Sequence, residues 1–227
     1  MSCFSTISEG RIAAIGALSA TQIAHLTITQ VRALTATGIA ALSFTQIAAL
    51  SVQHVANMGA GQIGDALVRA LRARTGKNIG LYAVKYPANT EVDLGANDMS
   101  GHVQWMMNNC PNTRLVLGGY SLGAAVTDVV LAVPLSFFTF KRPLPDGASD
   151  HIAAVALFGN GIQWVGPITS FSPVYKERTI ELCHGDDPIC NPTDPQNWQD
   201  YWPDHLAPAY ISAGMVNQAA DFVAGRI

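Results

Sequence analysis

Charged residues are scarce in this sequence of 227 residues: they make up only 13% of the chain, and the formal net charge is -3. No cluster of lysine or arginine stands out, which excludes nucleic acid as the expected partner. No apolar run reaches the roughly 20 residues that a membrane-spanning helix requires, so we predict no membrane span. Hydrophobic residues account for 49% of the chain. This composition predicts a compact globular protein with room for one α/β domain.

The spacing typical of metal ligands is also missing. The six histidines occur singly, and no C-x-x-C motif is formed by the four cysteines, Cys3, Cys110, Cys183 and Cys190. We therefore predict neither a metal nor an organic cofactor. A convincing signal peptide is lacking as well, because glycine and serine dilute the mildly apolar segment 12–20.

The first 60 residues repeat with a period of eight. From Ala13 onward, one isoleucine or valine and one leucine or methionine recur in each of the units. Eight residues at about 100° each would rotate the apolar stripe of one continuous helix by roughly 80° per unit. Capping boxes that restart a helix are predicted at Ser19 to Gln22, Thr27 to Gln30 and Ser43 to Gln46. We predict a helical octad-repeat segment of short helices over residues 1–58, with a continuous helix as the alternative and with an unknown partner.

Residues 59–227 alternate between predicted helices and strands. Residues 59–64 match G-x-G-x-x-G, but a repeat unit precedes them where a dinucleotide site needs a strand, so we expect them to open a helix. Strands are predicted at 79–86, 115–117, 151–158 and 178–183. Helices are predicted at 97–109, from 124 to about 131, and at 210–224. This order is typical of a parallel sheet with helices on both faces.

A G-x-S-x-G motif, residues 119–123, lies between the strand at 115–117 and the helix that follows. Strand, sharp turn and helix in that order form the nucleophile elbow of α/β-hydrolases. The turn would raise the Ser121 hydroxyl to the edge of the sheet and aim the amide of Leu122 at a developing oxyanion. The alternative is an ordinary glycine-rich turn, so the residues around the serine must decide.

A nucleophilic serine needs a base to accept its proton and an acid to orient that base. Asp186 and Asp187 follow a late predicted strand, and His205 precedes the last helix, which gives the order serine, acid, histidine. His184 is the second candidate for the base, but its loop is too short to turn back onto the serine. The order of the motifs leaves both aspartates open.

With these residues in view, the sequence resembles the cutinase family of serine esterases, especially its actinobacterial cutinase-like branch. The resemblance covers about residues 59–227. It rests on G-Y-S-L-G, on C-x-x-x-D-x-I-C from Cys183 to Cys190, and on His205-Leu206-Ala207. It implies a cutinase-like α/β-hydrolase domain over 59–227, with a parallel sheet flanked by helices, after the repeat segment.

The resemblance also implies roles for individual residues. The nucleophile is Ser121, the acid is Asp187, four residues after the first cysteine of its motif, and the base is His205. Leu122 would supply an oxyanion donor. An apolar acyl cleft would be formed by Ile189 and Leu206 with the phenylalanine-rich loop 135–140, and a disulfide would join Cys183 to Cys190. The implied substrates are short- to medium-chain esters or lipids, hydrolysed through an acyl-serine, and the implied location is secreted or at the cell surface.

The sequence departs from the family pattern at its start. In the family, a first strand ends in a turn that supplies the second oxyanion donor, but here the repeats occupy that place. Cys110 thereby loses its usual partner, and Cys3 is the remaining candidate. We therefore expect a weaker enzyme. The alternative function is a catalytically impaired, hydrolase-like surface or interaction protein that carries a repeat appendage.

Overall fold

The computed structural model describes residues 17–26, 42–43, 45–46, 49, 60–86, 91–133, 139–162 and 167–227. The chain divides into two compact units, Met1–Gly59 and Ala60–Ile227. Across the described ranges, no helix is both long enough and apolar enough to cross a membrane.

The described helix of the first unit is α2, Ala20–Ala24, which a capping box opens. The Ser19 hydroxyl accepts a hydrogen bond from the Gln22 amide, and the Gln22 side chain accepts one from the Ser19 amide. The same pair of bonds joins Ser43 and Gln46. Helix α2 has five residues. The predicted box at residues 27–30 and most of the repeats lie outside the described residues.

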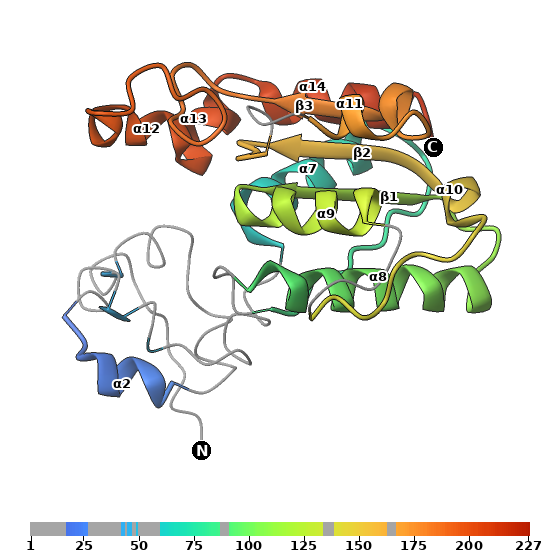
Figure 1. The fold of residues 1–227 in the computed structure, drawn as a ribbon, viewed down its shortest axis with the longest axis horizontal. Helices are drawn as coiled ribbons and strands as arrows, with labels where there is room; N and C mark the ends of the chain where they lie inside the picture. Colours follow the sequence, from blue (N-terminus) through green and yellow to red (C-terminus); the bar gives the residue numbers. More distant parts are fainter. Residues whose placement is uncertain are drawn as a thin grey trace. The chain divides into compact units, whose positions relative to one another are not determined.

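The second unit is built on a parallel sheet of three strands in the order β1-β2-β3. The strands are β1 (Leu115–Tyr120), β2 (Ile152–Phe158) and β3 (Thr179–Leu182). The helices are α7 (Gly61–Arg74), α8 (Val92–Asn109), α9 (Leu122–Ala132), α10 (Ala148–His151), α11 (Ile168–Phe171), α12 (Trp202–His205), α13 (Ala207–Ser212) and α14 (Met215–Ala224), with 3-10 turns η2 (Lys176–Arg178) and η3 (Trp198–Tyr201). Figure 1 shows the three strands side by side with α9 next to β1.

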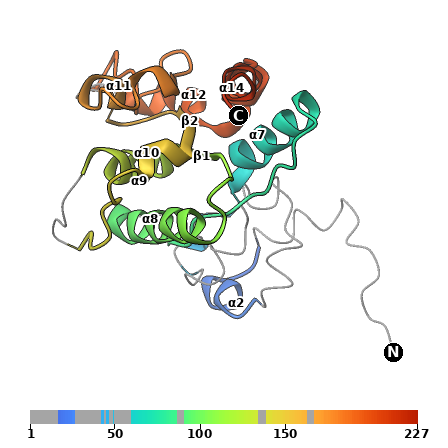
Figure 2. The same ribbon diagram turned by 90° about the vertical axis from the view of Figure 1, so that its right-hand side faces the viewer.

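Helices cover both faces of this sheet, and β2 is buried along its whole length. Its alternate residues belong to two separate cores. Val155 and Leu157 pack in the core with α8 and α9, whereas Ala154, Ala156 and Phe158 pack in the core with α7 and α14. Figure 2 shows these two helix layers on opposite sides of the strands. The predicted fold class, a parallel sheet flanked by helices, is therefore confirmed.

The prediction of a strand at residues 79–86 is wrong, because this segment has no regular secondary structure. Side chains satisfy part of its backbone: the Arg72 guanidinium donates to the Ile79 carbonyl at 2.8 Å. The Lys85 amide donates to Asp98 Oδ2, also at 2.8 Å. A strand exists only where a second strand completes its hydrogen bonds. Within the described ranges no strand pairs with this segment, so its alternating pattern could not produce one.

Two helix predictions differ in their bounds. The helix predicted at 97–109 begins earlier, at Val92. The helix predicted at 210–224 is two helices, because Gly214 adopts φ 76°, a left-handed conformation that separates α13 from α14. The phenylalanine-rich loop was predicted at residues 135–140, of which 135–138 lie outside the described residues. Phe140 is buried in the core beside α8 and α9.

Candidate active site

The turn between β1 and α9 carries Ser121 in a strained conformation. Its φ is 55° and its ψ is -120°, and it is the one non-glycine residue with positive φ in the part of the chain that the structure describes. Such a conformation is costly for a side chain with a Cβ atom and is typical of a nucleophile elbow. Because Leu122 is the first residue of α9, its amide has no acceptor within the helix and can serve a bound oxyanion.

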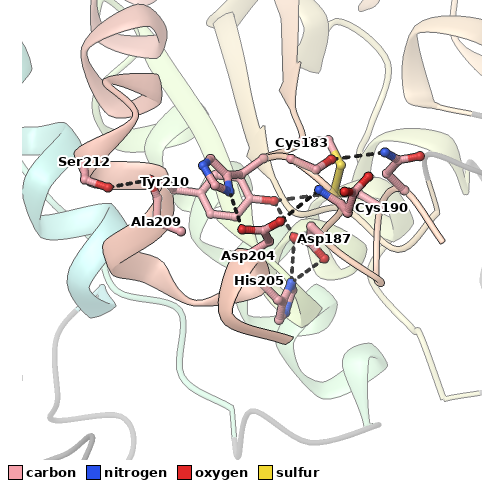
Figure 3. A network of polar contacts seen from close by, with 12 residues as sticks. Cys183, Asp187, Cys190, Asp204, His205, Ala209, Tyr210 and Ser212 are labelled. Carbon is pink, nitrogen blue, oxygen red and sulfur yellow. Dashed lines mark hydrogen bonds and ion pairs between the residues drawn. A yellow bond between two sulfur atoms is a disulfide. The ribbon is translucent and has the colours of Figure 1, made fainter. Parts of the chain in front are cut away.

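His205 and Asp187 complete a hydrogen-bonded chain that starts at this serine. Ser121 Oγ lies 2.9 Å from His205 Nε2. On the other side of the ring, His205 Nδ1 lies 2.9 Å and 2.8 Å from the two carboxylate oxygens of Asp187. Asp187 is 0% exposed and His205 is 4% exposed. The pair lies in the network that Figure 3 shows from close by.

The position of these residues follows from the parallel sheet. Ser121 comes directly after β1, and the loop with Asp187 comes after β3, so both leave the carboxyl edge of the sheet. His205 ends the short helix α12, which the chain forms just before α13. Residues that are far apart in sequence therefore meet at one edge, as in other α/β folds.

The environment of Asp187 keeps its carboxyl group charged. Burial raises the pKa of Asp187, but hydrogen bonds from His205, from the Tyr210 hydroxyl and from the Ile189 amide outweigh that effect. The Ile189 amide donates to Oδ1 at 2.8 Å. The net result is a pKa below the usual value for aspartate, so the carboxylate can stabilise a positive charge on His205.

The structure also separates the competing candidates. The side chain of the exposed Asp186 accepts a hydrogen bond from Thr193 and makes no hydrogen bond to His205. His184 Nδ1 lies 3.4 Å from Asp204 Oδ1 and not beside Ser121. Of the two aspartates and two histidines considered from the sequence, Asp187 and His205 are thus the pair that reaches the serine.

A disulfide closes the loop that holds Asp187. Cys183 and Cys190 form this bond, with their Cα atoms 5.8 Å apart. Cys110 carries a free, half-buried thiol, and Cys3 lies outside the described residues. No group of three histidine, cysteine or carboxylate side chains in the described ranges is arranged to hold a metal ion.

An apolar cavity of about 400 Å³ opens beside the hydrogen-bonded chain. It is lined by Pro188, Ile189, Pro192, Asp194, Pro195, Trp198 and Trp202. The Trp202 ring centroid lies 4.9 Å from that of His205, so the cavity adjoins the candidate site. Of the residues expected to form an acyl cleft, Ile189 lines this cavity. Leu206 and Leu122 are exposed and do not line this cavity.

Sequence reasoning missed two tyrosines and two tryptophans of this region. The Tyr120 hydroxyl donates to the His205 carbonyl, and the Tyr210 hydroxyl donates to Asp187 Oδ2. Tyr120 lies inside the G-x-S-x-G motif and could have been considered there. Nothing in the sequence near Tyr210 links it to an aspartate 23 residues earlier. Trp198 and Trp202 stand in an aromatic stretch of the sequence that matches no recognisable motif.

Known proteins resemble this chain over most of its length. Residues 40–227 match the family model described as Cutinase, and this match begins within the predicted repeat segment. Probable carboxylesterase Culp2 of Mycobacterium bovis is 69% identical over 169 residues, which cover 74% of this chain and 74% of that protein. Phospholipase Culp4 of Mycobacterium tuberculosis is 50% identical over 173 residues, which cover 74% of this chain and 73% of that protein.

A solved structure agrees with these matches. Trichoderma reesei cutinase in complex with a C11Y4 phosphonate inhibitor is 28% identical, with a TM-score of 0.50. The aligned part covers 72% of this chain and 65% of that one. Together with the family match and the relative at 69% identity, this likeness leads to one conclusion: the chain belongs to the cutinase family.

Proposed function

We propose that the protein is a serine esterase that hydrolyses short- to medium-chain carboxylic esters through an acyl-Ser121 intermediate. The observation that carries this proposal is the 2.9 Å contact between Ser121 Oγ and His205 Nε2, with Asp187 on the other side of the ring. Membership of the cutinase family and the carboxylesterase name of a relative at 69% identity support the reaction class.

In the first half of the reaction, Ser121 Oγ forms a bond to the ester carbonyl carbon while His205 Nε2 accepts the serine proton. The carbonyl electron pair moves onto oxygen, and the Leu122 amide donates a hydrogen bond to that oxyanion. The alcohol then leaves with the proton from His205. In the second half, His205 accepts a proton from water, whose oxygen attacks the acyl carbon. The bond from that carbon to Ser121 Oγ then breaks, His205 returns the proton to Oγ, and the acid leaves. Asp187 stabilises the imidazolium in both halves.

The acyl chain would occupy the apolar cavity beside Trp202. Each methylene group buried there adds about 0.8 kcal/mol, or roughly a fourfold gain in kcat/KM, until the cavity is filled. An open cavity of about 400 Å³ suits an acyl chain of short to medium length. We include lipid esters among the proposed substrates, because a relative at 50% identity is named a phospholipase.

The proposed enzyme is weaker than a family member with two oxyanion donors. In the family a turn before the elbow supplies the second donor, and no turn of that kind is recognisable in residues 1–58. Loss of one such donor costs about 10²- to 10³-fold in rate. This departure is also the observation that favours the second candidate function, a hydrolase-like surface or interaction protein with little activity.

The proposal further places the protein outside the cytoplasm, secreted or at the cell surface. Disulfides such as Cys183–Cys190 persist in oxidising surroundings and are rare where glutathione keeps thiols reduced.

Hydrolysis of p-nitrophenyl esters of increasing acyl length by the native protein and by Ser121→Ala tests the reaction. We expect turnover by the native protein, a rise in kcat/KM with chain length up to a limit, and no turnover above background by the variant. Equal rates for the two proteins would refute the role of Ser121. Absence of turnover on every ester would favour the interaction protein.

A further inference from the structure

Tyr210 lies directly behind the acid of the proposed site. This residue of α13 follows His205 by five positions and is 0% exposed. Its hydroxyl donates a hydrogen bond to Asp187 Oδ2 at 2.5 Å, and it lies 3.4 Å from the Sγ atom of Cys190 in the disulfide. Figure 3 shows Tyr210, Asp187 and the disulfide together in this network.

The hydroxyl of Tyr210 can act only as a donor toward this carboxylate. Burial and the hydrogen bond to Asp187 raise the pKa of Tyr210 far above its ordinary value, so the proton stays on the phenol oxygen. Tyr210 bonds to Oδ2 and the Ile189 amide bonds to Oδ1. With one additional donor on each oxygen, the carboxylate plane is fixed and both oxygens face His205 Nδ1.

The aromatic ring is held independently of the hydroxyl. It makes edge contacts with Phe158 of β2 and with Tyr120 at the end of β1, at centroid distances of 6.2 Å and 5.8 Å. These contacts fix the ring between the sheet and the disulfide loop. A phenylalanine at this position would keep the same ring contacts and lose only those of the hydroxyl, with Asp187 and with Cys190 Sγ.

We propose that Tyr210 is a positioning residue of the esterase: its hydroxyl holds the Asp187 carboxylate in the orientation that His205 needs for proton transfer. This inference rests on the proposed function. The contacts that support it connect the three elements that carry the site. Tyr120 from the elbow holds the backbone of His205, and Tyr210, from the helix after His205, holds Asp187. Together with the His205–Asp187 pair, these contacts tie the ends of β1, β3 and α12 to one another.

The first test is Tyr210→Phe, with Tyr175→Phe as the matched control. Tyr175 is also a buried tyrosine, 6% exposed, but belongs to the core with α8 and α9. For Tyr210→Phe we expect a loss of about 10- to 100-fold in kcat/KM, the range for one hydrogen bond to a charged group. We also expect the acidic limb of its pH profile to move to higher pH, because Asp187 loses a bond that favours its charged form. Tyr175→Phe should retain the native rate and pH profile.

A double-mutant comparison separates positioning from a general structural effect. The rate of fluorophosphonate labelling of Ser121 is measured for native protein, Tyr210→Phe, Asp187→Asn and the double variant. Labelling is used because it can still be measured when Ser121 reacts slowly, as expected in the Asp187→Asn variants. If Tyr210 acts through Asp187, the tyrosine change should cost less than about twofold in the Asp187→Asn background. An equal cost in both backgrounds would overturn the proposal, as would a native rate and pH profile for Tyr210→Phe.

The variant Ser121→Ala distinguishes failure of the positioning role from failure of the esterase proposal. If Ser121→Ala is inactive and Tyr210→Phe behaves like the native protein, the positioning role is wrong while the esterase proposal stands. If Ser121→Ala still hydrolyses esters at the native rate, both proposals are wrong.

Discussion

The backbone carbonyl carbon of Gly123 lies 2.0 Å from the position that a Cβ atom on Gly119 would occupy. No side chain fits at residue 119 unless the turn that presents Ser121 moves. At Gly123, by contrast, the nearest atom to an added Cβ is the Tyr86 hydroxyl oxygen, at 4.0 Å. The two glycines of the G-x-S-x-G motif are therefore not equivalent: the first is required by a close backbone approach, and the second has room for a methyl group.

Gly119→Ala should lower the free energy of unfolding by about 3 kcal/mol or more, because an added methyl group would overpack the turn. Gly123→Ala, near the start of α9, should change it by less than about 1 kcal/mol. Urea unfolding of the two variants measures the difference. Equal destabilisation would show that backbone approach does not distinguish the two positions.

Asp187→Asn should lower turnover by about 10⁴-fold, since an amide neither orients the histidine correctly nor stabilises its charge. Asp186→Asn is the matched control, because the neighbouring side chain is exposed and makes no hydrogen bond to His205. Its turnover should stay within about threefold of the native value. Steady-state kinetics on one ester compares the two, and similar losses would mean that Asp187 is not the orienting acid.

Reduction of the Cys183–Cys190 bond should lower the free energy of unfolding by about 2–3 kcal/mol, as expected for a short closed loop. Turnover should also fall, because the loop that carries Asp187 gains freedom. The change is followed by denaturant unfolding and ester hydrolysis with and without reductant. Thiol labelling of the unreduced, denatured protein is the control: reactive thiols at both 183 and 190 would show that the bond is absent.

A buried carboxyl group apart from the proposed site makes stability depend on pH. Asp128 of α9 is 4% exposed, and its Oδ2 accepts a hydrogen bond from Asn160 at 2.7 Å. Its Oδ1 has no hydrogen-bond partner among the described residues. Burial raises the pKa of Asp128 to about 6, although the Asn160 bond favours the charged form. Burial and the charge of Asp128 raise the pKa of Glu181 to about 7.

The direction of the effect follows from these pKa values. Between about pH 4 and pH 6, the folded chain keeps a proton on Asp128 that the unfolded chain has released. This contribution to stability is therefore complete below the unfolded pKa and is lost as the pH rises through the folded one. Asp128→Asn should raise the free energy of unfolding by about 1–3 kcal/mol at pH 8 and change it little at pH 4. The exposed Asp146→Asn is the control, and equal gains at both pH values would contradict the explanation.

Much of the candidate site could be predicted because its residues lie in recognisable sequence motifs. Ser121 was indicated by the glycines around it. The order of the motifs left Asp186 and Asp187 open, and the resemblance to the cutinase family pointed to Asp187. His205 was chosen over His184 because of its order in the chain and its place before the last helices. The central strand β2 was visible as an apolar run, since a strand buried on both faces needs apolar side chains in every position.

The features that were missed depend on partners that local sequence does not specify. Residues 79–86 alternate like a strand, yet a strand also needs a neighbour, and within the described ranges none is present. The role of Tyr210 arises from a contact between segments 23 residues apart, which the packing of α13 against the sheet creates. The separation of α13 from α14 was detectable, because Gly214 is suited to a left-handed conformation.

The central claim is that Ser121 is the nucleophile activated by His205. Its most direct test is labelling of the native protein with a fluorophosphonate, followed by peptide mapping of the adduct. We expect one modified residue, Ser121, and labelling that Ser121→Ala abolishes and His205→Ala slows by at least about 10³-fold. Modification of a different serine, or undiminished labelling of Ser121→Ala, would contradict the claim.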